Sequence, residues 1–420
     1  MDYVIKGNLC YSDRPESLWT LENGYLVVAG GTYAGAFSEL PAEYRGLPIT
    51  DWGDRLILPG FSDLHLHAPQ FAYRGLGMDL ELIEWLEKRA YPEESKYSDL
   101  TYANLAYGLF VDALRKSVTT RFCCFATLHA PATLMLMEKL EAAGMRGYVG
   151  KVSMDRNAPE TLCECDAERA ARDCENWLIE SQKRFTAIRP VITPRFIPSC
   201  TDTLMERLAA LAKTYDVPVQ SHLSENRSEI EWVKQLCPQA KGYADAYDRM
   251  GMLGPSTVMA HVVYPEEEEI ALLRERGVTV AHCPASNTNI RSGIAPVRKL
   301  LNAGVKVGLG TDVAGGQTID MLRAVTDAVQ ASKLYWRLMD QREKALTLPE
   351  AFYLATKGGG AFFGRVGSFE AGYEADAVVL DDTALPHPQE LTVRERVERA
   401  LYLSGECRVA QKYVAGKAIL

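Results

Sequence analysis

Residues 56–70, Leu-Ile-Leu-Pro-Gly-Phe-Ser-Asp-Leu-His-Leu-His-Ala-Pro-Gln, decide the fold of this chain. An apolar run enters the stretch, a Pro-Gly pair interrupts it, and two histidines separated by one residue close it. Side chains at i and i+2 of a strand point to the same side, so His65 and His67 can direct two imidazoles to one point, with Asp63 on the same face. Taken alone, two such histidines more often lie in a protein core, where hydrogen bonds satisfy their ring nitrogens. The metal interpretation therefore depends on further ligands elsewhere in the chain.

The composition is that of a large globular protein with an acidic balance. The chain has 420 residues, of which 47% are hydrophobic and 24% charged, and this length fits two or three domains or one large barrel. The net charge of −9 argues against a nucleic-acid or anionic-membrane partner, because phosphate binding needs a dense basic surface. The net charge does not exclude a small neutral or cationic substrate.

The cysteines and the N-terminus indicate a reducing, cytoplasmic location. Cys123 and Cys124 are adjacent and Cys163 and Cys165 are separated by one residue, but the ten cysteines include no Cys-x-x-Cys pair. We expect mainly core thiols. The N-terminus lacks a basic region followed by an apolar one, and no apolar run reaches the roughly 20 residues of a membrane helix.

Both ends of the chain have the pattern of a β domain. From Tyr3 to Trp52, short alternating segments are separated by turn residues such as Glu22-Asn23-Gly24 and Gly30-Gly31. Near the C-terminus, an apolar strand pattern at 377–380 precedes a hairpin turning at Ala415-Gly416. We therefore expect residues 1–57 and 369–420 to form one small β domain around a different middle, residues 58–368.

The middle alternates apolar runs with helical segments. After the opening strand, the runs are 118–125, 147–152, 190–196, 217–223, 257–261, 278–283 and 305–311. Helical spacing is present at 203–213, and the run Pro265-Glu266-Glu267-Glu268-Glu269 is typical of a helix start. Eight strands alternating with helices predict a (β/α)8 barrel, whose active site lies at the C-terminal strand ends.

Histidines are concentrated at those predicted strand ends. Five of the seven in the chain are placed there: His65, His67, His222, His261 and His282. Imidazole and carboxylate ligands suit zinc, with Fe²⁺ possible. We assign four residues to one metal ion: His65, His67, His222 and Asp312, the last at the mouth of the eighth strand. His261 is then placed to hydrogen-bond water or substrate.

Two further features of the sequence indicate the number of metal ions in the site and the residue that moves protons. A binuclear site needs a bridging carboxylate or modified lysine, and residues 190–196 contain no lysine, so one metal per chain is expected. A bound divalent ion lowers the pKa of water to about 7. Glu225, three residues after His222, is a candidate general acid and base, although a glutamate on a surface loop is the alternative interpretation.

Several longer motifs resemble the amidohydrolase superfamily, and within it the guanine deaminase family, over nearly the whole chain. The superfamily motifs are 59–67, His222, His261, Asp312 and 282–287. The narrower resemblance is carried by 67–70, 193–196, 221–227, 308–316, 84–88 and 125–129. It implies a zinc enzyme that hydrolyses guanine to xanthine and ammonia in purine catabolism or salvage. The implied structure is a distorted barrel with a β-sandwich from both termini, usually assembled as a homodimer.

The resemblance also implies roles for individual residues. Metal-activated hydroxide would attack C2 of the purine, Asp312 would move a proton from water to the leaving amine, and Glu225 would protonate the adjacent ring nitrogen. From its position beside the water or substrate, we also count His261 among the catalytic residues. The implied substrate contacts are His67, Gln70, Arg195, Phe196, His222, Glu225 and Asp312. An arginine offers fixed donors to the O6/N7 side of guanine.

Other interpretations stay open. The barrel could deaminate another cyclic amidine, such as a pterin, an 8-oxopurine or a triazine, or it could be a non-catalytic scaffold. The cytidine-deaminase class is excluded, since its His-x-Glu and Pro-Cys-x-x-Cys signatures are missing from the sequence. We expect His282 beside the metal ligands, His129 at the pocket rim or in a structural role, and His387 in a solvated segment.

Overall fold

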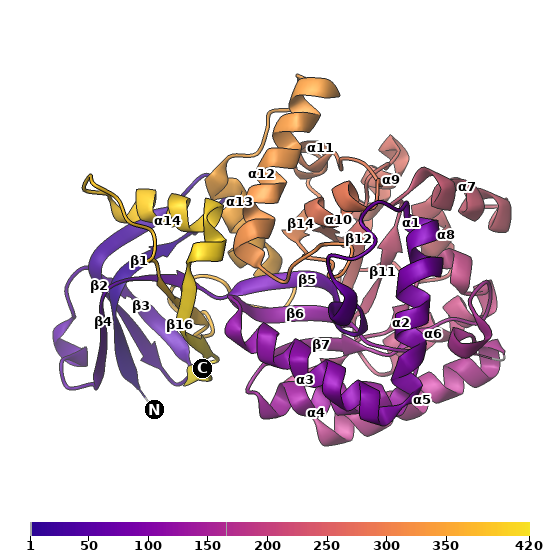
Figure 1. Cartoon of the computed structure of the whole chain (residues 1–420), viewed down its shortest axis with the longest axis horizontal. Coiled ribbons are helices and arrows are strands. Elements are labelled where there is room, and N and C mark those ends of the chain that lie inside the picture. The colour runs from indigo at the N-terminus through magenta and orange to yellow at the C-terminus, as the bar shows by residue number, and fades with distance from the viewer. Residues whose placement is uncertain (1, 165) are drawn as a thin grey trace.

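The computed structural model describes residues 2–164 and 166–420, so Cys165, one of the expected core thiols, lies outside the described residues. Its main body is a barrel of parallel strands surrounded by helices (Figure 1). The strands are β5 (Phe61–His67), β6 (Thr119–Phe125), β7 (Arg146–Gly150), β9 (Ile188–Pro190), β11 (Val219–Leu223), β12 (Thr257–His261), β13 (Thr279–His282) and β14 (Lys306–Leu309). The predicted distorted (β/α)8 barrel is confirmed.

The barrel is built from two four-stranded parallel sheets, β5-β6-β7-β9 and β11-β12-β13-β14. At one seam, Ile192 forms a parallel bridge with Val219. At the other, the Asp312 amide donates to the carbonyl oxygen of His65 at 2.8 Å. This second seam places the residues after β14 directly against the two histidines of β5.

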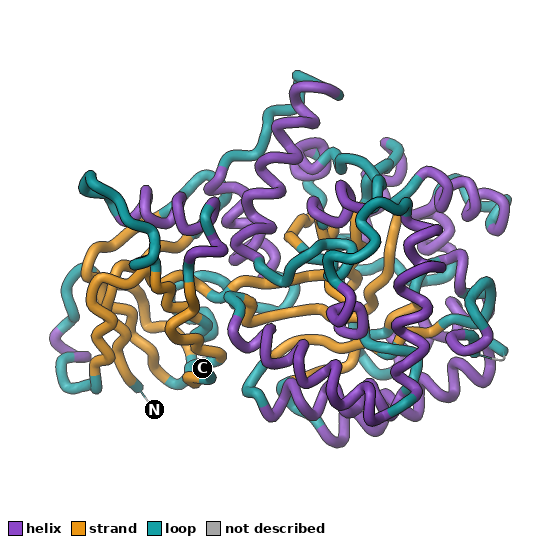
Figure 2. The backbone as a smooth tube through the Cα atoms, viewed as in Figure 1, coloured by secondary structure: helices purple, strands orange, loops and turns teal. Residues whose placement is uncertain are grey.

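Helices connect the strands and cover the outside of the barrel (Figure 2). They are α3 (Leu100–Lys116), α4 (Ala130–Ala142), α5 (Ala167–Arg184), α6 (Asp202–Thr214), α7 (Arg227–Leu236), α8 (Tyr243–Arg249), α9 (Glu267–Arg276), α10 (Pro284–Asn289), α11 (Val297–Asn302), α12 (Met321–Leu338) and α13 (Leu348–Tyr353). The predicted helix at 203–213 is α6, and the predicted start in the four-glutamate run is correct, because Glu266 caps α9. None of the helices that the structure describes combines the length and apolar character needed to cross a bilayer.

One segment between β5 and α3 lies over the C-terminal side of the barrel. It contains the 3-10 turn 68–73, α1 (Leu82–Trp85), a π-helical turn at 86–90 and α2 (Tyr91–Glu94). Leu82, Trp85 and Leu86 are buried and line a pocket there.

Strands from both termini form one seven-stranded sheet, in the order β17-β16-β15-β4-β1-β2-β3. Their bounds are β1 (Tyr3–Tyr11), β2 (Trp19–Ala29), β3 (Thr32–Phe37), β4 (Ile49–Pro59), β15 (Ala377–Asp381), β16 (Arg408–Val414) and β17 (Lys417–Ala418), with α14 (Val393–Tyr402) beside them. The sheet curls so that Thr32 bridges Glu374 and Gly31 accepts a hydrogen bond from the Ala375 amide. It thereby encloses an apolar core that includes Ile5, Leu26 and Val379.

Two local predictions are wrong. Glu22-Asn23-Gly24 is not a turn but a bulge inside β2, where Asn23 has a φ of 48° and its amide donates to Asn8 Oδ1 at 3.0 Å. A bulge inserts residues without ending the strand. The predicted fourth strand, 190–196, is split into β9 and β10 (Thr193–Pro194), and β10 pairs with β8 (Val152–Ser153).

A buried ion pair joins the terminal sheet to the barrel. Arg121 on β6 donates to both carboxylate oxygens of Asp376, at 2.6 and 2.9 Å, and also to Glu374 at 2.8 Å. We expect Asp376→Asn to lower the free energy of unfolding by about 3–5 kcal/mol, because it leaves the buried guanidinium without its main counter-charge. Chemical denaturation measures this. Glu374→Gln is the control, since Glu374 is partly exposed, and equal losses for the two variants would contradict the assignment.

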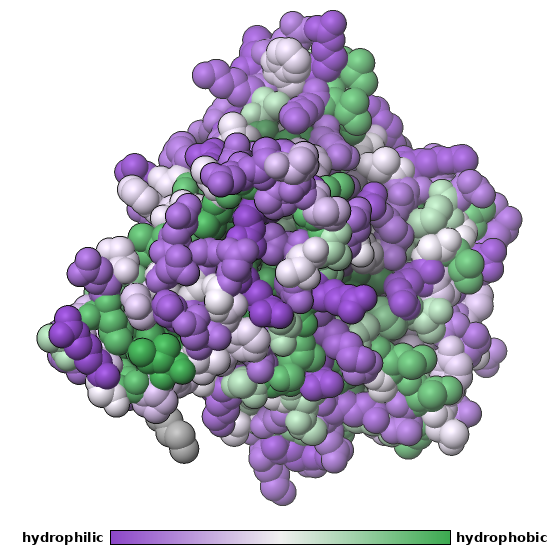
Figure 3. All heavy atoms as spheres, turned by 60° about the vertical axis from the view of Figure 1, so that its left-hand side comes forward, coloured by the Kyte–Doolittle hydropathy of each residue, from purple (hydrophilic) through white to green (hydrophobic). Residues whose placement is uncertain are grey.

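The surface is predominantly polar. Figure 3 shows one face on which hydrophilic side chains prevail and hydrophobic ones gather in separate patches. Of the described cysteines, seven are buried: Cys10, Cys123, Cys124, Cys174, Cys200, Cys237 and Cys283. The expectation of core thiols is therefore met at these seven positions.

Candidate metal and substrate site

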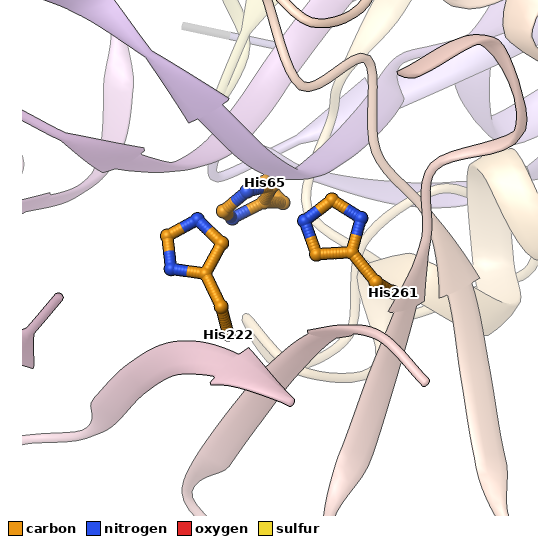
Figure 4. A group of neighbouring side chains, drawn as sticks. All are labelled: His65, His222 and His261. Atoms are coloured by element: carbon orange, nitrogen blue, oxygen red, sulfur yellow. The ribbon is translucent and has the colours of Figure 1, made fainter. Parts of the chain in front are cut away.

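Four histidine side chains converge at the C-terminal end of the barrel. His65 and His67 come from β5, His222 from β11 and His261 from β12, and the rings of three of them face a common centre (Figure 4). The Nε2 atoms of His67 and His222 are 3.2 Å apart. The structure thus brings together imidazoles that are up to 196 positions apart in the sequence.

Asp312 closes this group from the loop after β14. Its Oδ1 lies 3.1 Å from His65 Nε2 and 3.3 Å from His67 Nε2. Its backbone has a φ of 47°, and that of His261 is 76°, so both adopt the left-handed conformation that few non-glycine residues take. Main-chain bonding across the β5–β14 seam holds the Asp312 carboxylate in place.

Neighbouring groups fix the orientation of the rings. His222 Nδ1 lies 2.6 Å from the Arg195 carbonyl oxygen, and His261 Nδ1 lies 2.9 Å from Asn287 Oδ1. Each contact leaves the Nε2 atom of its ring facing the centre. Such partners on the second ring nitrogen are characteristic of metal-binding histidines.

The donor set fits a divalent transition-metal ion. Among the described residues, the buried Nε2 atoms of His65 and His261 have no hydrogen-bond partner. Burial lowers the pKa of His65 and His222, and lowers that of His67 to about 4, so these rings are neutral and can act as ligands. Ligand atoms of His65, His67 and Asp312 all lie within 4.8 Å of one another, as do those of His65, His222 and His261.

Glu225 lies beside this centre, directly after β11. Its Oε2 is 3.3 Å from His261 Nε2, and its Oε1 accepts from Ser292 Oγ at 3.1 Å. Burial, and secondly the charge of Asp312, raise the pKa of Glu225 well above its usual value. A carboxyl group with a raised pKa holds its proton more firmly than an ordinary one and is suited to donate it to a bound base.

A second polar cluster adjoins the same pocket. Arg195 follows β10, and its guanidinium donates to Glu94 at 2.5 and 3.0 Å. Gln70 Nε2 also donates to Glu94, at 2.8 Å. Sequence analysis missed Glu94, because Pro92-Glu93-Glu94 is typical of a solvated helix start. It also assigned no role to Asn287 or Ser292.

One pocket connects the polar cluster with the histidines. Its polar lining comprises His67, Gln70, Arg195, His222, Glu225, His261 and Asp312, and its apolar lining comprises Leu82, Trp85, Leu86, Phe196 and Ile290. An apolar lining with a few convergent polar groups is typical of a pocket that binds a small molecule. Every residue predicted to contact substrate lines this pocket.

The other three histidines are not among the four whose side chains converge. His282 is buried on β13, its Nδ1 has no partner among the described residues, and burial lowers its pKa to about 3. His129 precedes α4 and lines a separate hollow with Lys151. His387 is exposed, as expected.

Comparisons with known proteins identify the family. The model of the amidohydrolase family matches residues 56–417. The chain belongs to the amidohydrolase family. Within this family, a mouse guanine deaminase is 41% identical over 90% of this chain and 85% of the mouse protein, and one from Escherichia coli is 34% identical over 97% and 94%. The predicted membership is confirmed.

Solved amidohydrolase structures agree with this result. A crystal structure of a guanine deaminase from C. acetobutylicum, with guanine bound in its active site, matches with a TM-score of 0.96 and 41% identity over 100% of both chains. A triazine hydrolase matches with a TM-score of 0.85 but 19% identity, and so supports the fold alone. The predicted resemblance to guanine deaminases, within the amidohydrolase family, is confirmed by these relatives.

Proposed function

We propose that this protein is a metal-dependent guanine deaminase that hydrolyses guanine to xanthine and ammonia. One observation carries the proposal: a single pocket joins a histidine-carboxylate centre to Arg195 and Gln70, which can hold the polar edge of a purine. The guanine deaminases at 34–41% identity support it. Xanthine and ammonia release from guanine is the direct test.

In this proposal His65, His67, His222 and Asp312 would hold one ion, and His261 would hydrogen-bond water or substrate. A bound divalent ion supplies hydroxide near neutrality by lowering the pKa of water to about 7. Asp312 takes the proton from the attacking water and passes it to the leaving amine. Glu225 protonates the ring nitrogen next to C2, which its raised pKa favours, and takes up the proton of the new C2 hydroxyl when the 2-oxo group forms and ammonia leaves.

The pocket walls orient the base for this proton transfer. Arg195 and Gln70 donate to its acceptor edge, while Phe196 and Ile290 pack against it. Trp85 and the two leucines of the covering segment keep bulk water from the pocket.

We further propose that the ion is Zn²⁺, with Fe²⁺ as the alternative, and that the protein is a cytoplasmic homodimer without nucleic-acid or membrane partners. Nitrogen and oxygen donors suit both metals. Metal analysis of purified protein tests the metal, and light scattering on a size-exclusion column tests the dimer.

Removal of the metal is expected to abolish turnover and lower thermal stability. A ligand at about 1,000 times its Kd stabilises the native state by about 4 kcal/mol, so the melting temperature should fall on chelation. Adding Zn²⁺ should restore both properties, whereas Mg²⁺ should restore neither, because Mg²⁺ prefers oxygen ligands. Full turnover by metal-free protein would contradict the proposal.

Arg195→Lys is expected to lower kcat/KM for guanine by about 10²-fold, because a lysine cannot reproduce the paired donors of a guanidinium. Steady-state kinetics measure this, with the exposed Arg207→Lys as control. The alternative substrates, a pterin, an 8-oxopurine or a triazine, are assayed beside guanine. A substrate whose turnover is fast and unaffected by this change would replace guanine in the proposal.

A further inference from the structure

Glu94 is a buried carboxylate that organises the substrate-binding side of the pocket without being part of the pocket lining. It is 2% exposed, and the Arg195 and Gln70 it contacts are 3% and 1% exposed. Its Oε2 accepts from Arg195 Nη1, and its Oε1 accepts from both Arg195 Nη2 and Gln70 Nε2. One carboxylate therefore fixes two neighbouring side chains at once.

These contacts also determine which way the Gln70 amide points. An ionised carboxylate only accepts hydrogen bonds, so the nitrogen of Gln70 must face Glu94. The oxygen of Gln70 accepts from the Ala314 amide at 3.2 Å, which excludes the flipped orientation. Among the described residues, this amide nitrogen has no second hydrogen-bond partner, so its other N–H is available to the pocket that Gln70 lines.

The orientation of the Arg195 guanidinium is also fixed by its neighbours. Two of its guanidinium nitrogens face Glu94, and the guanidinium carbon lies 5.2 Å from the centre of the Tyr91 ring. Although burial opposes ionisation, the adjacent guanidinium holds the pKa of Glu94 below its usual value. The carboxylate therefore stays charged and the paired geometry persists at neutral pH.

We infer that Glu94 is a positioning residue that gives this pocket its selectivity for a 6-oxopurine over a 6-aminopurine. By fixing Arg195 and Gln70, it presents only N–H donors to the edge of the base. A carbonyl oxygen at position 6 and the adjacent ring nitrogen N7 accept those bonds, whereas a 6-amino group would set donor against donor. This inference rests on the proposed function.

The position of Glu94 in the chain adds a second consequence. Glu94 ends α2, and the segment leading to it carries Leu82, Trp85 and Leu86, which line the pocket. The same hydrogen bonds that orient Arg195 thus hold this covering segment on the barrel. The contact between Glu94 and Arg195 therefore contributes both to recognition of the base and to closure of the pocket.

The test is Glu94→Gln, compared with Glu93→Gln. Glu93 precedes Glu94, but its carboxylate contacts Lys96 and Tyr102 and lies outside the pocket, so it is the matched control. Two quantities are measured: kcat/KM for guanine, and the inhibition constant of 2,6-diaminopurine, which keeps the 2-amino group and carries an amino group at position 6.

For Glu94→Gln we expect kcat/KM for guanine to fall about 10- to 100-fold, the effect of disturbing a hydrogen bond to a charged group. The inhibition constant of 2,6-diaminopurine should stay within about threefold of wild type, so selectivity decreases. Metal content should not change, and Glu93→Gln should match wild type. Equal weakening of both compounds, or an unchanged kcat/KM for guanine, would overturn the inference.

A second pair of variants covers the case in which Glu94→Gln alone fails to fold because it leaves Arg195 without its counter-charge. Arg195→Met and the double variant Glu94→Gln/Arg195→Met remove that charge. Since Glu94 acts mainly through Arg195, the double variant should lose less than about threefold relative to Arg195→Met. A further loss of about 10-fold or more in the double variant relative to Arg195→Met would overturn the inference. A wild-type protein that does not turn over guanine would instead refute the proposed function.

Discussion

Asp312→Ala is expected to lower kcat for guanine by about 10⁴-fold or more, because it removes a metal ligand and the group that moves the proton. The Asp312 carboxylate lies 3.1 and 3.3 Å from the Nε2 atoms of His65 and His67. Burial opposes ionisation of Asp312, but the adjacent imidazoles of His65 and His67 hold its pKa well below the usual value.

Two measurements separate these two roles of Asp312. Inductively coupled plasma mass spectrometry should find less than one ion per chain in Asp312→Ala, whereas Asp312→Asn, which retains an oxygen donor but cannot take a proton, should lose turnover with a smaller loss of metal. Asp340→Ala is the control, since Asp340 pairs with Arg342 away from the site. Unchanged metal content in Asp312→Ala would remove Asp312 from the ligand set.

Glu225→Gln is expected to lower kcat by about 10²- to 10⁴-fold, the range found for general acid–base groups. Glutamine keeps the contact with Ser292 and the size of the side chain but has no carboxyl proton to donate. Because Glu225 contacts His261 and Ser292, and we do not place it among the metal ligands, metal content should remain at one ion per chain.

The control for Glu225 is Glu231→Gln, an exposed residue on α7 that pairs with Lys234. Steady-state kinetics and metal analysis are carried out on both variants. Near-normal turnover by Glu225→Gln would refute its role, and loss of the metal would show that Glu225 belongs to the ligand set.

The barrel and the histidine centre were predictable because they depend on local patterns. Apolar runs of four to eight residues mark buried strands, and polar residues directly after them mark the C-terminal mouth. The four histidines lie within the last three residues of their strands and Asp312 lies three residues after β14, so their convergence followed from the fold class.

The parts that were not predicted depend on contacts between distant segments. Glu94 is buried only because Arg195, 101 positions later, pairs with it. The bulge at Asn23 depends on its pairing with Asn8 of the adjacent strand. The division of the fourth strand depends on the pairing of Thr193 with Val152. Local composition carries no signal for such partners, and each of these residues has the pattern of an ordinary turn, strand or helix start.

The most direct test of the account is the release of xanthine and ammonia from guanine by zinc-loaded protein, with adenine, 8-oxoguanine and a pterin assayed in parallel. We predict rapid conversion of guanine, equal amounts of the two products, poor turnover of the other compounds, and loss of activity on chelation. Protein that holds one metal ion per chain and leaves guanine unchanged would contradict the account.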